Sequence, residues 1–104
     1  MPASRRFRLL ADLPFEVAFK SITYRLAIVQ VPVSGLWQLR ASYPAGYWLC
    51  AHAGSEEALR QALYGEGLLL EPATVPRTIF DRLVKEGRAE VAKDELADAK
   101  AQRR

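Results

Sequence analysis

Residues 36–53 have the sequence LWQLRASYPAGYWLCAHA, which predicts two antiparallel strands joined by a tight turn and so decides the fold. Pro44 restricts φ at the first central position of a type I turn, and Gly46 tolerates the left-handed conformation that follows it. A turn of this kind predicts that Tyr43 faces Tyr47. From this pair on, the cross-strand pairs that share a face of the hairpin recur every second residue along each strand.

The predicted hairpin has one apolar face and one polar face. Its further pairs would be Ala41 with Leu49, Leu39 with Ala51, and Trp37 with Ala53, all on the apolar face. The other face would carry Gln38, Arg40, Ser42, Trp48, Cys50 and His52. A tryptophan in the middle of a polar face is unusual and needs an explanation.

Length and composition predict one globular domain over residues 1–104, with frayed ends at 1–4 and about 98–104. A single cysteine excludes an internal disulfide framework, and Asp12 and Pro14 interrupt the early apolar run that a secretory signal requires. The longest uncharged segments are too short to span a membrane and contain turn residues. We therefore expect a cytoplasmic protein that does not interact with membranes.

Charge is distributed unevenly along the chain. Residues 1–54 contain six Lys and Arg against two acidic residues, whereas residues 55–104 contain nine against ten. This asymmetry allows a nucleic-acid or acidic-protein partner, but it is weaker than the dense basic stripe of a dedicated nucleic-acid binder. The lack of Asn and the excess of Arg over Lys fit either a thermophile or the codon bias of a high-GC genome.

The N-terminal part contains one clear strand and one ambiguous segment. Residues 5–10 predict a strand with Phe7 and Leu9 on one side. Residues 12–26 fit a helix capped by Asp12, but they also fit two strands with alternating apolar residues. We prefer the helix because four apolar residues share one helical stripe, namely Phe15, Phe19, Ile22 and Leu26.

The middle of the chain predicts a meander followed by a helix. Residues 27–33 have strand composition and lead through a turn at Ser34 into the hairpin, so residues 27–53 form an antiparallel meander with 27–33 at its centre. Ser55 is placed to cap a helix that ends near residues 65–67. Residues 68–70 then allow a short strand.

The last segment is predicted to begin as a helix at Pro76, a residue favoured in the first helical turn. Two continuations fit the pattern. Either one helix extends over residues 76–101, or it breaks at Gly87 and leaves a short strand at 88–91 and a tail helix. The fold class is thus α+β, with an antiparallel sheet of about four strands and two or three helices packed mainly on one face.

The sequence contains no recognisable catalytic, metal or cofactor motif. Cys50 and His52 are two residues apart on a strand and would point the same way, but a structural zinc site needs four ligands and a catalytic site about three. A cysteine nucleophile would also need a third group to orient its base. We interpret this pair as a small buried cysteine beside a surface histidine.

The remaining candidate site is a binding patch on the polar face of the hairpin. It comprises Gln38, Arg40, Trp48 and His52, joined by Arg25 or by the N-terminal arginines Arg5, Arg6 and Arg8. Trp48 would lie close enough to Arg40 for a cation–π contact. Either a helix covers this face and Trp48 belongs to the core, which we prefer, or the face is an exposed aromatic and basic patch.

These features predict a small protein-interaction or accessory domain that self-associates through its sheet as a homodimer. The excess of aromatic residues and the lack of catalytic motifs both favour this function. The alternative is a nucleic-acid-binding domain that uses the basic N-terminal strand and the face of Arg40 and Trp48. An enzyme is the least favoured class, because no set of acid and base residues forms a motif.

Overall fold

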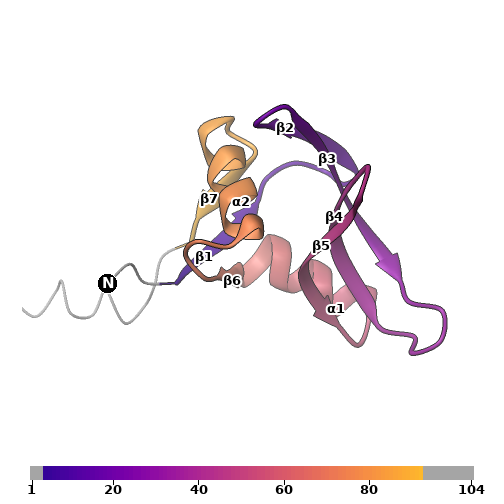
Figure 1. Cartoon of the computed structure of the whole chain (residues 1–104). Coiled ribbons are helices and arrows are strands. Elements are labelled where there is room, and N and C mark those ends of the chain that lie inside the picture. Colours follow the sequence, from indigo (N-terminus) through magenta and orange to yellow (C-terminus); the bar gives the residue numbers. More distant parts are fainter. Residues whose placement is uncertain (1–3, 93–104) are drawn as a thin grey trace, which may run out of the picture.

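The computed structural model describes residues 4–92, which form an α+β fold with two antiparallel sheets (Figure 1). The large sheet has the order β2-β3-β4-β5, with β2 at Phe15–Phe19, β3 at Ile22–Gln30, β4 at Trp37–Tyr43 and β5 at Gly46–Ala53. The small sheet has the order β6-β1-β7, with β1 at Arg5–Leu9, β6 at Leu68–Leu70 and β7 at Ala89–Val91. The helices are α1 at Glu56–Gln61, continued by the π-helical turn η1 at Ala62–Glu66, and α2 at Val75–Lys85.

The predicted meander is confirmed, with β3 in a central position between β2 and β4. The preferred helix over residues 12–26 is wrong, since this segment forms β2 and the first half of β3. A two-residue turn at Lys20 and Ser21, with φ of 50° and 67°, joins the two strands. Pairing along this hairpin buries Val17 and Tyr24 on one face, so tertiary packing decides between two periodicities that are both present in the sequence.

The hairpin of β4 and β5 is confirmed, but its register is only partly as predicted. The predicted pairs Leu39 with Ala51 and Trp37 with Ala53 are present at its base. At the tip, Tyr43 faces Gly46 and not Tyr47, because the loop has two residues where three were predicted. A β-bulge at Cys50 connects the two registers, and from there to the tip every side chain of β5 is on the face opposite to the predicted one.

The helices begin as the sequence predicts. Ser55 caps α1 by accepting a hydrogen bond from the Ala58 amide at 3.1 Å, and Thr74 caps α2 by accepting one from the Arg77 amide at 3.3 Å. Helix α2 ends at Lys85, so the interpretation with a break at Gly87 is correct. The tail helix of that interpretation, the predicted frayed end at about 98–104 and all but the last residue of the predicted frayed end at 1–4 lie outside the described residues.

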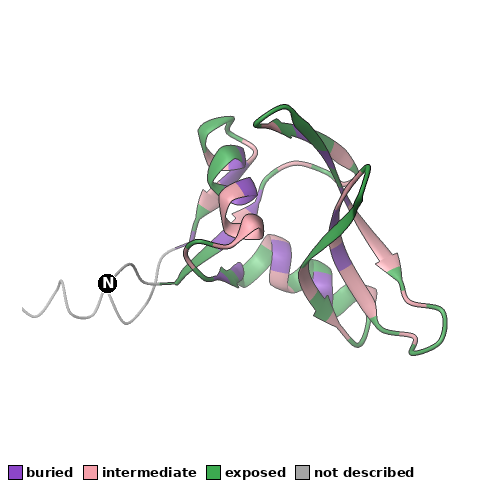
Figure 2. Cartoon of the chain, viewed as in Figure 1, coloured by how far each residue is buried: buried purple, intermediate pink, exposed green. Residues whose placement is uncertain are grey.

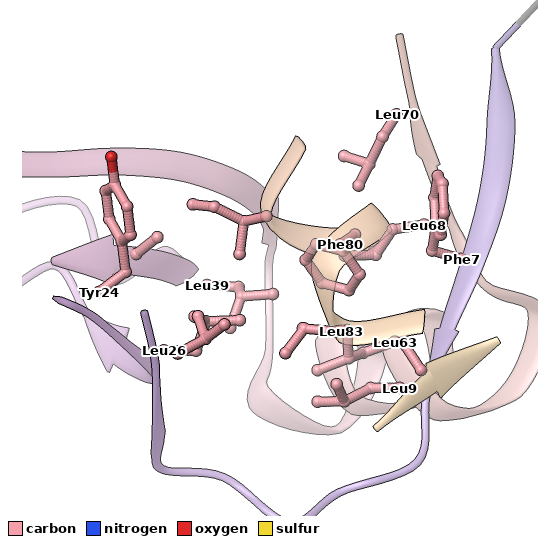
Figure 3. Close-up of a cluster of buried hydrophobic side chains, with 14 of the residues drawn as sticks. Phe7, Leu9, Tyr24, Leu26, Leu39, Leu63, Leu68, Leu70, Phe80 and Leu83 are labelled. Carbon is pink, nitrogen blue, oxygen red and sulfur yellow. The ribbon is translucent and has the colours of Figure 1, made fainter. Parts of the chain in front are cut away.

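One buried cluster connects both sheets and both helices (Figure 3). The side chains of Leu63 and Leu83 lie between Leu39 of the large sheet and Leu9 of the small sheet. The Phe80 ring packs against Phe7 with their centroids 5.9 Å apart. The helices therefore cover one face of the large sheet, and exposed residues are frequent along β2 and β5 (Figure 2).

Candidate interaction surface

The second face of the large sheet, which we call the outer face, carries no buried residue. Cross-strand pairing places twelve side chains on it, and the helices pack on the opposite face. These are Glu16, Ala18, Thr23, Arg25, Ala27, Val29, Gln38, Arg40, Ser42, Tyr47, Leu49 and His52. Two large apolar side chains stand out, because Tyr47 is 48% exposed and Leu49 is 44% exposed.

Arg40 is held in place at the centre of the outer face. Its guanidinium carbon lies 4.0 Å from the centroid of the Tyr47 ring, and its Nε donates a hydrogen bond to Oε1 of Gln38 at 2.8 Å. Leu49 is its cross-strand partner on β5. The result is a positive charge in a fixed position among apolar side chains, a composition favoured at protein interfaces.

The charge of the outer face is weakly positive. Arg25 and Arg40 are opposed by one carboxylate of the face, Glu16, which is the cross-strand partner of Arg25. His52 is exposed and faces Gln38. Three of the predicted patch residues, Gln38, Arg40 and His52, therefore lie together as expected.

Trp48 does not lie with these residues. The bulge pairs it with the buried Ala41, so it is on the inner face and stacks on Tyr43 at 6.4 Å between ring centroids with an interplanar angle of 15°. It is nevertheless 40% exposed, so it is not a core residue either. The predicted contact of Arg40 with Trp48 is replaced by the contact with Tyr47, and the register shift explains why the sequence did not identify Tyr47 and Leu49.

The N-terminal arginines lie on the small sheet, away from the outer face. Arg6 Nη1 donates a hydrogen bond to the Gly67 carbonyl at 3.3 Å, and Arg8 Nε donates one to the Gly65 carbonyl at 2.6 Å. Arg8 also pairs with Glu90 at 2.8 Å, whereas Arg5 is exposed. Arg6 and Arg8 thus bind carbonyl groups at the C-terminal end of η1, where backbone carbonyls lack intrahelical partners.

Cys50 and His52 do not form a joint site. The bulge separates them, because Cys50 packs against the core while His52 is on the outer face. Burial raises the pKa of the Cys50 thiol to about 12, so at neutral pH it is protonated and is a weak nucleophile and metal ligand. Within residues 4–92, no group of three or more His, Cys, Asp or Glu side chains could hold a metal ion.

A hollow on α1 brings together several ionisable groups that are already engaged. It has a volume of about 680 Å³, and Glu56, Arg60 and Tyr64 are among its lining residues. Arg60 pairs with Glu56 at 3.0 Å, and the Tyr64 hydroxyl donates a hydrogen bond to the Ala11 carbonyl at 2.9 Å. Burial is also the main cause that raises the pKa of Tyr64. Because Arg60 and Tyr64 are bound to other groups of the fold, we interpret their role as structural.

A second groove runs beside β5, the strand at the edge of the large sheet. It has a volume of about 550 Å³ and lies between β5 and the segment that connects β6 to α2. On the side of β5 it is lined by Trp48, Leu49 and Cys50, and on the other side by residues from 69 to 76. This groove is the second exposed apolar area of the large sheet.

Comparisons of the chain with protein-family models, with curated proteins and with solved structures found no match. In the part of the chain that the structure describes, no helix is both long enough and apolar enough to cross a membrane.

Proposed function

We propose that this protein is a protein-interaction domain that self-associates through the outer face of its large sheet. The observation that carries the proposal is the uncovered set of apolar side chains around Arg40, which includes Tyr47 and Leu49. Exposed apolar areas of this kind usually mark an interaction site, and Tyr and Arg are enriched at interfaces. A twofold symmetric dimer is the simplest arrangement that would cover this face.

We assign no reaction, metal or cofactor to the domain, and we propose that it acts in the cytoplasm. The protonated Cys50 thiol and the paired groups on α1 support a role in binding over one in catalysis. Its partner would be a second copy of the chain or another protein with an apolar face.

The substitution Ala27→Lys tests this proposal. Ala27 lies on the outer face opposite Arg40, so a lysine there adds charge at the centre of the proposed interface, where a twofold axis repeats it. We expect light scattering to show a dimer for the wild-type protein and a dimer dissociation constant raised about tenfold or more for the variant.

Gln61→Lys serves as the matched control, because it adds the same charge at an exposed position on α1. It should leave the association unchanged. A wild-type protein that stays monomeric at high concentration would contradict self-association, and equal association of both variants would exclude the outer face as the interface.

The alternative proposal is that the outer face binds single-stranded nucleic acid. Two observations favour it, namely the excess of Arg25 and Arg40 over Glu16 and the exposed ring of Tyr47, on which a base could stack. Retention on single-stranded DNA at low salt, lost steeply as the salt concentration rises, would favour this alternative over self-association.

A further inference from the structure

The two edges of the large sheet differ in how they are protected. At the β2 edge, Arg88 Nη1 donates a hydrogen bond to the Glu16 carbonyl at 2.8 Å, and its guanidinium carbon lies 4.7 Å from the centroid of the Phe15 ring. A side chain that occupies edge carbonyls in this way prevents another strand from pairing there. Sheets are usually protected by such contacts, or by charged residues and prolines on the edge strand.

In the described part of the chain, the β5 edge has no covering contact of this kind, and of the features that protect sheet edges it has only a β-bulge. The strand Gly46–Ala53 contains no Asp, Glu, Lys, Arg or Pro, and within residues 4–92 it pairs with β4 alone. Its one irregularity is the bulge at Cys50. Bulges are common at sheet edges and beside functional sites, where they redirect a side chain. Here the bulge directs Trp48 into the groove that runs beside the strand.

The groove provides an apolar wall opposite this free edge. Beyond β5, it is lined by Leu69, which is 57% exposed, and by Val75 and Pro76 at the start of α2. A strand added to β5 would direct alternate side chains towards this wall, because side chains alternate between the two faces of a sheet. A free strand edge beside an apolar wall is the arrangement in which proteins bind extended peptides by strand addition.

The groove favours a single strand over a second copy of the domain. In a dimer formed through β5, the β4 strand of the second copy would have to continue the sheet on the side where residues 69–76 stand. Charge favours a basic segment, since Glu71 is the one charged residue among those that line the groove. A Lys or Arg beside it would form a charge-assisted contact, and an acidic residue there would be repelled.

We propose that β5 binds an extended peptide segment of another protein as an added strand, with alternate apolar side chains in the groove and a Lys or Arg near Glu71. This proposal goes beyond the proposed self-association, because it uses the edge of the sheet and the groove in place of the outer face. The two surfaces can therefore be tested separately.

The first experiment selects peptides from a library of random sequences displayed on phage, with the full-length wild-type protein as bait. We expect enrichment of sequences that alternate apolar residues and carry a Lys or Arg. Enriched peptides are then synthesised with a fluorescent label, and their binding is measured by anisotropy. Leu69→Lys should weaken binding about tenfold or more, because it places a charge on the groove wall.

Val91→Lys is the matched control, since Val91 is an exposed apolar residue on β7, outside the groove. It should leave peptide binding unchanged. Glu71→Lys is a second test at an exposed position and should weaken binding of the basic peptides about tenfold. No enrichment on the wild-type protein, or equal binding to Leu69→Lys, would overturn the proposal.

Hydrogen exchange of the peptide complex tests whether the peptide is added as a strand. The amides of Gly46–Ala53 that do not pair with β4 should become protected when the peptide is bound, and unchanged exchange would refute strand addition. A dimer that dissociates in Leu69→Lys but not in Ala27→Lys would identify a second copy as the occupant of the groove. That result would overturn the proposal that a peptide binds in the groove. It would also show that self-association does not use the outer face.

Discussion

The half-buried thiol of Cys50 makes the stability of the fold depend on pH. Its pKa is raised from 9.0 to about 12 because burial disfavours the thiolate. Between these values the unfolded chain releases the proton and the folded chain retains it. The contribution of the thiol to stability is therefore complete below pH 9 and is lost as the pH rises.

Chemical denaturation at pH 7 and at pH 10 measures this effect. We expect the free energy of unfolding to fall by up to about 1.4 kcal/mol more in the wild-type protein than in Cys50→Ala. Tyr64 titrates in both proteins, so its contribution cancels in the comparison. The same loss in both proteins would show that the thiol is accessible to water in the folded state.

At the level of elements, the junction between η1 and β6 depends on Gly67. This residue has φ of 96°, and an added Cβ would lie 3.3 Å from the Cβ atoms of Ala92 and Arg6 and from the Phe7 carbonyl oxygen. We expect Gly67→Ala to lower the free energy of unfolding by about 1–3 kcal/mol, because the backbone is strained for any residue with a Cβ and the space is filled. Urea denaturation measures the loss.

Gly65→Ala is the control for this substitution. Gly65 lies two residues earlier, and a Cβ there would meet no atom within 4 Å. Its effect should stay within about 0.5 kcal/mol, as is usual for surface positions, or stabilise slightly through a smaller loss of chain entropy. If both alanine variants were equally stable, the close approach of β1 at Gly67 would not matter for stability.

At the level of the whole molecule, the shared core should make both sheets unfold together. The cluster that contains Phe7 of the small sheet also contains Leu39 of the large sheet, and α2 contributes Phe80 to it. Small proteins with one core usually unfold in a single cooperative transition. We expect Phe7→Ala to cost about 3–5 kcal/mol, since it removes a fully buried ring.

Two spectroscopic signals distinguish joint from separate unfolding. Both tryptophans, Trp37 and Trp48, lie in the large sheet, so their fluorescence follows that sheet, whereas far-UV circular dichroism follows the whole chain. The two denaturation curves should coincide, and Phe7→Ala should shift both to lower denaturant concentration by the same amount. A fluorescence transition that does not move would mean that the large sheet unfolds independently.

Local features of the fold were predictable because they depend on residues close in sequence. Ser55 and Pro76 mark the starts of the helices, and the alternation of Phe7 and Leu9 marks β1. The pairing at the base of the hairpin, Leu39 with Ala51, was also predicted correctly from the local sequence. Gln38, Arg40 and His52 were grouped correctly for the same reason.

Whether residues 12–26 form a helix or strands does not depend on the local sequence alone. Lys20 and Ser21 are not one of the Asn-Gly, Asp-Gly or Gly-Gly pairs that favour a two-residue hairpin turn with positive φ, and the helical stripe and the strand alternation are both present in the sequence. Pairing of β2 with β3, with Val17 and Tyr24 buried on one face, settles the choice. The energy of that packing comes from residues distant in sequence.

By itself, the sequence determined the α+β class, the helix starts, the meander and the hairpin, since turn chemistry and side-chain periodicity act over a few residues. Only the tertiary structure decided the bulge at Cys50. One extra residue there moves Trp48 from the outer face to the groove and brings Tyr47 and Leu49 to the outer face. The physical reason is that strand register depends on the pairing and burial of both strands together, which the residues of one strand do not specify.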